Sequence, residues 1–137
     1  MRKSLFVVLS LLCLSLAVLA QTQQAASEKN LLGAWTGSWG GGSSGTFEMT
    51  ITKDADGKLG GSITPKPEGG ESYTTSFKSV TLADGKVTLK VAVPGDEAEV
   101  TVEATLDGSV LKGTYSVRSK EDGREVDAGT FKASKKP

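Results

Sequence analysis

Clusters of turn-forming residues recur roughly every ten residues from Leu31 to the end of the chain, a spacing typical of proteins built from short strands. Seven such clusters separate eight segments, and four of the clusters contain an Asp-Gly pair: Asp56-Gly57, Asp84-Gly85, Asp107-Gly108 and Asp122-Gly123. Asp-Gly is the strongest short hairpin signal because both residues tolerate a positive φ. This spacing limits the fold more than any other feature of the sequence, because it leaves room for strands and tight turns only.

Apolar and polar residues alternate within these segments, as they do in a strand that buries one face. The stretch TFEMTIT, for example, places Phe47, Met49 and Ile51 on one side and polar residues on the other. Three later segments alternate in the same way. The alternation changes phase within Phe77–Val80 and within Ala128–Phe131, so we expect a β-bulge or a strand break at each place.

The connections between the segments are short, so consecutive strands must pair antiparallel. The longest connection after the first strand pair, Pro65 to Gly70, is still too short for a convincing Greek-key crossing, which argues against an immunoglobulin-like sandwich. An up-and-down meander of eight strands removes its two exposed edges by closing on itself. The sequence therefore predicts an all-β protein, an eight-stranded antiparallel up-and-down barrel. Its interior would be just wide enough to be filled by side chains or to hold one small ligand.

The first twenty residues have the pattern of a cleaved secretory signal peptide. Arg2 and Lys3 precede an apolar run, and the small residues Val18 and Ala20 fit a cleavage site after Ala20. A retained membrane anchor is the alternative, but the apolar run is shorter than the roughly 20 residues that a spanning helix needs. Lipoprotein attachment at Cys13 is a weaker alternative, because Leu12 stands where a small residue is required.

The resulting organisation is a signal peptide over 1–20, a flexible leader over 21–30, a barrel domain over 31–134 and a basic tail over 135–137. We expect a secreted or periplasmic protein that contacts a membrane only through the signal peptide before cleavage. Ser27 is suited to cap one short helical turn at the end of the leader.

The composition of the mature chain narrows the function classes. The whole chain has 16 basic and 16 acidic residues, so loss of Arg2 and Lys3 leaves a small acidic excess, which argues against a nucleic-acid partner. Cleavage also removes the single cysteine, and the chain has no histidine, so thiol and imidazole chemistry are excluded from the mature protein. A small secreted animal domain would usually carry disulfides, which makes a bacterial origin the better hypothesis.

Three short motifs are arranged as they are at the start of lipocalin-like and avidin-like barrels. Gly33-Ala34-Trp35 opens the first predicted strand, Gly45-Thr46-Phe47 the second, and Asp56 to Gly61 the third. Over these roughly thirty residues the chain resembles the calycin group, in which Gly-x-Trp marks the first strand. The resemblance implies a barrel whose Trp35 packs across one end, and it allows ligand binding. It does not extend to biotin, because avidin-like proteins use tryptophans in later strands and this chain has none after Trp39.

The two tryptophans carry different expectations although they share one face of the first strand. We predict that Trp35 closes one end of the barrel as a core residue, since buried aromatic rings dominate the packing of small cores. Trp39 is followed by three glycines, which cannot pack around it, so it is the better candidate for a ligand-binding residue at the barrel mouth. Tyr73 and Tyr115 are the further candidate ligand-binding residues, from later inward-facing positions.

The small inward-facing residues Gly37, Gly61, Ala104 and Gly113 leave two explanations open. They let strands bend and approach closely, or they leave a cavity. The carboxylates offer no comparable signal: Asp54 and Asp56 lack the glutamate of a calcium loop, and Glu97, Glu99 and Glu103 alternate with buried valines and so face solvent.

These observations predict no catalytic residues, no metal and no cofactor. The leading hypothesis is an exported non-enzymatic barrel that binds a small apolar or amphipathic molecule. The alternative is a structural or protein-interaction module of the cell envelope with a filled core. The interior volume of the barrel is the observation that separates the two.

Overall fold

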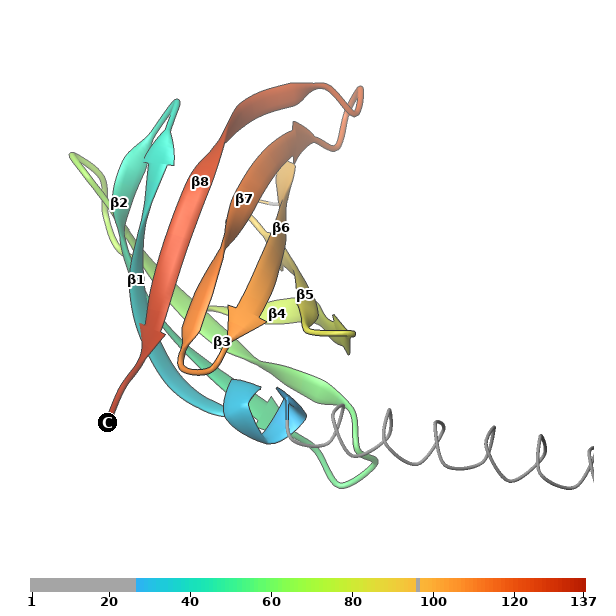
Figure 1. Ribbon diagram of the computed structural model, residues 1–137. Helices are drawn as coiled ribbons and strands as arrows, with labels where there is room; N and C mark the ends of the chain where they lie inside the picture. Colours follow the sequence, from blue (N-terminus) through green and yellow to red (C-terminus); the bar gives the residue numbers. More distant parts are fainter. Residues whose placement is uncertain (1–26, 96) are drawn as a thin grey trace, which may run out of the picture.

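The computed structural model describes residues 27–95 and 97–137, and these form a closed antiparallel barrel of eight strands in the order of the sequence (Figure 1). The strands are β1 (Gly33–Gly41), β2 (Ser44–Lys53), β3 (Leu59–Pro67), β4 (Thr75–Ala83), β5 (Lys86–Ala92), β6 (Ala98–Asp107), β7 (Val110–Ser119) and β8 (Glu125–Lys135). Each strand pairs with the next, and β8 pairs with β1 from Trp35–Lys135 to Gly41–Gly129. The predicted up-and-down barrel is confirmed. The predicted signal peptide and most of the leader lie outside the described residues.

The two ends of the barrel carry different sets of strand connections. The connections β2–β3, β4–β5 and β6–β7 lie at the same end as the N-terminal segment, whereas β1–β2, β3–β4, β5–β6 and β7–β8 are connected at the other end (Figure 1). We call the first the closed end and the second the open end. The Asp-Gly turns at Gly57, Gly85, Gly108 and Gly123 all have the positive φ that the sequence predicted.

The closed end is sealed by the segment that precedes β1. Residues 27–31 form a short helix that includes the last four residues of the expected flexible leader, and the Leu31 side chain is fully buried. Trp35 is also fully buried, and its indole N–H donates a 2.8 Å hydrogen bond to the Leu31 carbonyl oxygen. The buried indole therefore satisfies its one polar group and covers the barrel end at the same time.

The C-terminal residues are held against this end rather than free of it. Strand β8 runs to Lys135, whose ammonium group donates to the Asn30 carbonyl oxygen at 2.8 Å. The Lys136 ammonium group donates to Glu48 Oε1 at 2.9 Å, and this bond, with the charges of Lys136 and Lys66, lowers the pKa of Glu48. Of the three residues expected in a basic tail, Lys135 thus pairs with the short helix and Lys136 with the barrel wall.

Two irregularities interrupt the strand ladder. A register shift between Phe77 and Ser79 confirms the bulge expected within Phe77–Val80. The second expected position is wrong: β8 alternates regularly through Ala128–Phe131, and the shift lies where Val117 pairs with Asp127 but Arg118 pairs with Glu125. The extra residue is Val126, which has no partner between these two pairs. The expected position was wrong because Ala128 faces outward and not, as its apolar side chain suggested, inward.

Strands β3 and β4 form the weakest seam of the barrel, since only Ser62–Ser76 and Ile63–Thr75 are paired between them. Pro65 and Pro67 lie in the part of β3 beyond these two pairs, and proline has no N–H to give to a ladder. A 2.8 Å hydrogen bond between the hydroxyls of Thr64 and Thr74 continues the contact toward the open end. The loop that carries Tyr73 follows this seam.

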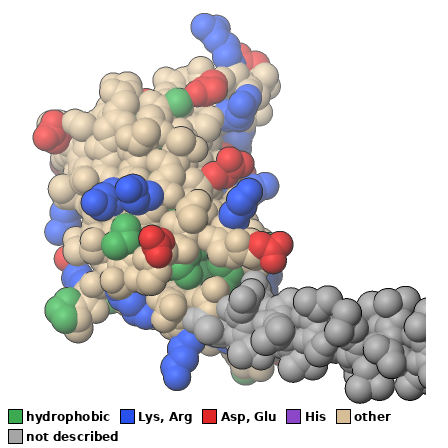
Figure 2. All heavy atoms as spheres, viewed as in Figure 1, with side chains coloured by type: hydrophobic (Ala, Val, Ile, Leu, Met, Phe, Trp, Pro, Cys, Tyr) green, Lys and Arg blue, Asp and Glu red, His purple; other side chains and the backbone are tan. Residues whose placement is uncertain are grey.

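The outer surface mixes the two signs of charge. Figure 2 shows basic and acidic side chains interspersed over the face in view, with small hydrophobic areas between them. Within the described ranges, none of the helical segments has the length and apolar character needed to cross a membrane.

Candidate ligand-binding cavity

The open half of the barrel encloses a cavity of about 240 Å³. Side chains from β1, β2, β3, β5, β6, β7 and β8 line it, together with residues of the β1–β2 and β3–β4 loops and Val93 beyond β5. The lining residues are Trp39, Ser43, Phe47, Met49, Ile63, Pro65, Pro67, Tyr73, Leu89, Val91, Val93, Val100, Val102, Tyr115, Val117, Asp127 and Phe131. The wall is therefore mostly aliphatic and aromatic.

Strand alternation supplies this apolar wall. Val100 and Val102 project inward from β6, and Leu89 and Val91 lie opposite them on β5. The outward residues between them are polar. The period of two that predicted half-buried strands thus also determines which side chains face the cavity.

Aromatic rings from β1, β2 and β8 contact one another along one side of the cavity. Phe47 lies 6.4 Å from Trp39 and 6.3 Å from Phe131 between ring centroids, and both pairs are tilted, a favourable arrangement for aromatic rings. Below them the core is filled, with Trp35, Ile51 and Leu111 almost completely buried.

The glycines of the inner face are used for close strand approach, which decides between the two explanations that the sequence left open. A methyl group on Gly37 would meet the Lys132 carbonyl oxygen and would lie 2.7 Å from the Phe47 ring. A methyl group on Gly113 would lie 2.8 Å from the Ala104 Cα atom. Both glycines therefore allow neighbouring backbones to crowd together, and the cavity is bounded by larger side chains farther toward the open end.

Four polar groups gather at the mouth. The Trp39 indole N–H donates to Ser43 Oγ at 3.2 Å, and the Ser43 hydroxyl donates to Asp127 Oδ2 at 2.6 Å. The Tyr115 hydroxyl lies 3.4 Å from the same carboxylate oxygen and 3.4 Å from the Ser43 carbonyl oxygen. We call these residues, Trp39, Ser43, Tyr115 and Asp127, the mouth network. It joins β1, the β1–β2 loop, β7 and β8.

The glycine run that follows Trp39 makes room for this network. A methyl group on Gly42 would collide with Asp127 Oδ1, and one on Gly45 would lie 2.5 Å from the Trp39 ring. The Gly42 N–H also donates to the Ala128 carbonyl oxygen at 3.2 Å. These glycines therefore have a packing role, since side chains on Gly42 or Gly45 would displace the carboxylate or the indole.

The structure brings the three predicted ligand-binding residues together. Trp39, Tyr73 and Tyr115 all line this cavity, although they come from β1, the β3–β4 loop and β7. Burial raises the pKa of the Tyr73 hydroxyl above the ordinary tyrosine value. Trp35, predicted to close the barrel, lies outside the cavity lining and is buried at the closed end.

Sequence reasoning missed Ser43 and Asp127. The phase break assigned within Ala128–Phe131 placed Asp127 on the outer face, but Asp127 is in phase with the inward residues Gly129, Phe131 and Ala133. Counting back by twos from Phe131 would have placed Asp127 inside. Nothing local marks Ser43, because its role depends on a carboxylate 84 residues away in the chain.

The other carboxylates singled out in the sequence lie elsewhere. Glu99 forms an ion pair with Lys78 at 3.3 Å on the outer face, and Asp54 Oδ1 accepts from the backbone N–H groups of Asp56 and Lys58 within a hairpin turn. In the described ranges, no three Asp, Glu, Cys or His side chains are grouped as metal ligands.

The fold and the cavity together define a class: a closed, eight-stranded, up-and-down antiparallel barrel with one plugged end and one cavity-bearing end. A similar fold is found in the solved structure of EF1p2_mFAP2b bound to DFHBI, with a TM-score of 0.67 and 10% sequence identity over 82% of this chain and 99% of that chain. At this identity the likeness shows the fold alone. No protein-family model matches the sequence, and no curated protein matches it significantly.

Proposed function

We propose that this protein is an exported, non-enzymatic barrel that binds a small apolar or amphipathic molecule in its cavity. The observation that carries the proposal is the cavity of about 240 Å³, whose wall is mostly apolar and whose polar groups gather at one end. Sites for small molecules generally combine an apolar wall with a few converging polar groups. The EF1p2_mFAP2b barrel, solved with DFHBI bound, supports the proposal by analogy of fold.

The size of the cavity limits the ligand. Pockets for drug-sized molecules usually measure about 300–1,000 Å³, so this cavity suits a ligand at or below the lower limit. An apolar body of one or two fused rings, with one polar group at the mouth, fits both the volume and the distribution of polar atoms. The alternative, a structural or interaction module with a filled core, has less support because the open half of the barrel is hollow.

Export remains part of the proposal and rests on the sequence of residues 1–20. The charged start, the apolar run and the small residues before Gln21 support cleavage after Ala20 and a secreted or periplasmic location, with a bacterial source as the favoured origin. Membership of the calycin group is proposed on the Gly33-Ala34-Trp35 pattern and the barrel. Mass spectrometry of the exported protein would find Gln21 at the N-terminus, whereas an intact Met1 in a membrane fraction would contradict export by cleavage.

Ligand binding is tested with N-phenylnaphthylamine, a neutral probe whose fluorescence increases in an apolar site. We expect saturable binding to the purified protein. Val102→Phe would fill part of the cavity from β6 and should weaken binding about tenfold or more. Thr105→Phe places the same ring on the exposed face of the same strand and serves as the matched control, with unchanged binding.

Two results would contradict the proposal. If the wild-type protein does not bind the probe, the filled-module alternative becomes the better description. If Val102→Phe folds, as judged by circular dichroism, and binds as the wild type does, the probe occupies another site. Hydrolytic turnover of ester or glycoside substrates by the purified protein would contradict the non-enzymatic part.

A further inference from the structure

The cavity has a single carboxylate at its mouth, and this carboxylate has no basic partner in the described part of the chain. Asp127 is the only Asp or Glu among the lining residues, and neither Lys nor Arg lines the cavity. Its hydrogen-bond donors are the hydroxyls of Ser43, at 2.6 Å, and Tyr115, at 3.4 and 3.5 Å to the two oxygens. Both donors are neutral, so they orient the carboxylate without compensating its charge.

Because of the bulge in β8, Asp127 is the only carboxylate of that strand that faces the interior. If β8 continued without the bulge, Val126 would pair with Arg118, and strand alternation would turn Glu125 toward the interior as well. Instead Glu125 lies opposite Arg118, with its carboxylate 3.9 Å from the guanidinium group. The one acidic group of β8 that has a cation beside it is therefore outside, and the one without a cation faces the cavity.

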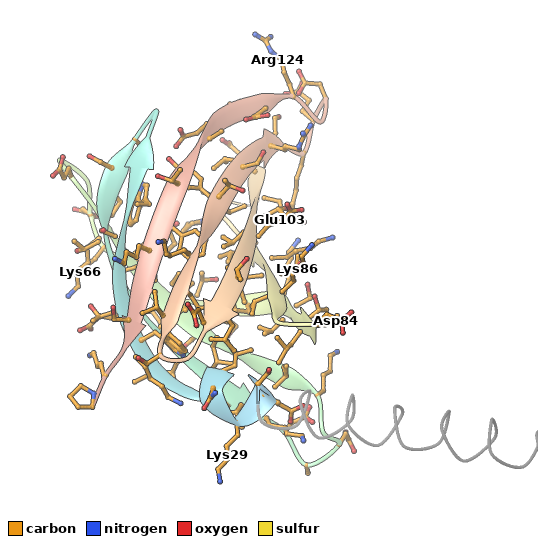
Figure 3. The ribbon with its side chains drawn as sticks, viewed as in Figure 1. Lys29, Lys66, Asp84, Lys86, Glu103 and Arg124 are labelled. Carbon is orange, nitrogen blue, oxygen red and sulfur yellow. The ribbon has the colours of Figure 1, made fainter. Side chains whose placement is uncertain are left out.

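Two basic residues near the open end, Lys66 and Arg124, do not supply the missing charge. Figure 3 shows the side chains of Lys66 and Arg124 pointing away from the barrel, and Lys66 is near Glu48 on the outer face, at 4.0 Å. The β3–β4 loop at this end, residues 68–74, carries Glu68 and Glu71 and no basic residue. The charge near the mouth thus favours the approach of a cation.

Aromatic side chains line the same cavity. Trp39 and Tyr115 belong to the mouth network, and Tyr73 lines the same cavity. Organic ammonium groups bind well where a carboxylate and aromatic rings converge, because the ring faces attract cations and the carboxylate supplies the opposite charge. An anionic ligand would instead bring a second negative charge to Asp127 inside a largely apolar cavity.

From this arrangement we propose, building on the proposed function, that the ligand is a cationic amphiphile: an apolar body in the cavity and an ammonium group paired with Asp127. The carboxylate accepts from the ammonium N–H groups through the lone pairs that Ser43 and Tyr115 leave unused. Ligands with the same apolar body would fit the cavity wall equally well. The negative charge of Asp127 then favours the ligand whose polar group is cationic.

Three ligands with one ring system test the proposal at neutral pH: naphthylmethylammonium, naphthylmethanol and naphthoate, each measured by displacement of N-phenylnaphthylamine. We expect the ammonium compound to bind about tenfold more tightly than the alcohol, and naphthoate to bind most weakly. Asp127→Asn keeps the shape of the side chain and removes its charge. It should reduce the affinity for the ammonium compound about tenfold and leave the affinity for the alcohol within about twofold.

Glu125→Gln is the matched control, because it removes one negative charge from the same strand at a position outside the cavity. The order of the three ligands should not change in this variant. If the wild type binds the alcohol as tightly as the ammonium compound, or naphthoate most tightly, the inference is overturned, and this comparison needs no variant to fold. An unchanged ratio of ammonium to alcohol affinity in a folded Asp127→Asn variant would also overturn it.

The outcomes separate the two proposals. Binding of the reporter without any dependence on ligand charge refutes the cationic amphiphile and leaves the proposed function standing. Failure of the reporter to bind refutes both.

Discussion

Trp35 and Trp39 lie four residues apart on the same face of β1, yet they end in opposite surroundings. Trp35 is completely buried, and its indole N–H donates to a backbone carbonyl of the short helix at residues 27–31. Trp39 is partly exposed, and its indole N–H donates to the side chain of Ser43 in a glycine-rich loop. Both rings lie on the same face of β1, so the difference in their burial comes from the residues that cover each end of the barrel.

The comparison shows how one repeated hairpin pattern produces both a stable core and a site. At the closed end, a helix and large aliphatic side chains fill the interior. At the open end, Gly42 and Gly45 leave room for the Asp127 carboxylate and the Trp39 ring, and the mouth network occupies the mouth.

The largest expected effect is the loss of the ring at the closed end. Trp35→Ala would leave a cavity among fully buried side chains and should lower the free energy of unfolding by about 3 kcal/mol or more. Chemical denaturation followed by circular dichroism measures the loss. A cost below about 1 kcal/mol would show that the closed end does not depend on this ring.

A methyl group between the two tryptophans tests how tightly the strands are packed there. Gly37→Ala would force the new side chain against Phe47 and the β8 backbone and should destabilise the protein by about 1–3 kcal/mol. Gly40→Ala, on the same strand beyond Trp39, meets no atom within 4 Å and should cost less than about 0.5 kcal/mol. Equal costs would contradict the close approach of β1, Phe47 and β8 at Gly37.

Removal of the ring at the open end should be milder. Trp39 contacts Phe47 but remains partly exposed, so Trp39→Ala should cost about 1 kcal/mol, clearly less than Trp35→Ala. In a Trp35→Phe background, the emission of Trp39 should lie to the red of that of a buried indole and shift to the blue when N-phenylnaphthylamine or another apolar ligand binds. Equal large losses of stability for both rings, with no spectral response, would make both of them core residues.

The smallest effect concerns Tyr73. Burial raises the pKa of its hydroxyl, so in a Tyr115→Phe variant the absorbance of tyrosinate should develop at higher pH in the folded protein than in the denatured protein. Because the unfolded state releases this proton first, stability should fall slightly as the pH rises through the unfolded pKa of about 10, and level off above the folded pKa. A bound apolar ligand should raise the pKa further, and an ordinary pKa in the folded state would place Tyr73 in water rather than at the cavity.

The cavity residues that were predicted from the sequence are those marked by a pattern in the neighbouring residues of the chain. Trp39 was chosen for its glycine neighbours, and Tyr115 for its phase within an alternating segment, and both line the cavity. Asp127 was missed because Ala128, a small apolar residue, was assigned to the interior. Exposing an alanine side chain to solvent costs little free energy, so an alanine indicates almost nothing about which face of a strand it lies on. Ser43 could not be found locally, since its partners come from β7 and β8.

The sequence by itself determined the strands, their turns and the closed meander, because Asp-Gly turns and two-residue alternation act within a few residues of chain. It also determined which residues of β5 and β6 face inward. Only the tertiary structure decided that the interior is hollow toward the open end, next to Phe47, and that it is filled around Trp35 at the closed end. Volume inside a barrel depends on how all eight strands approach one another, and close contacts such as that of Gly37 with β8 become defined only when β1 and β8 meet.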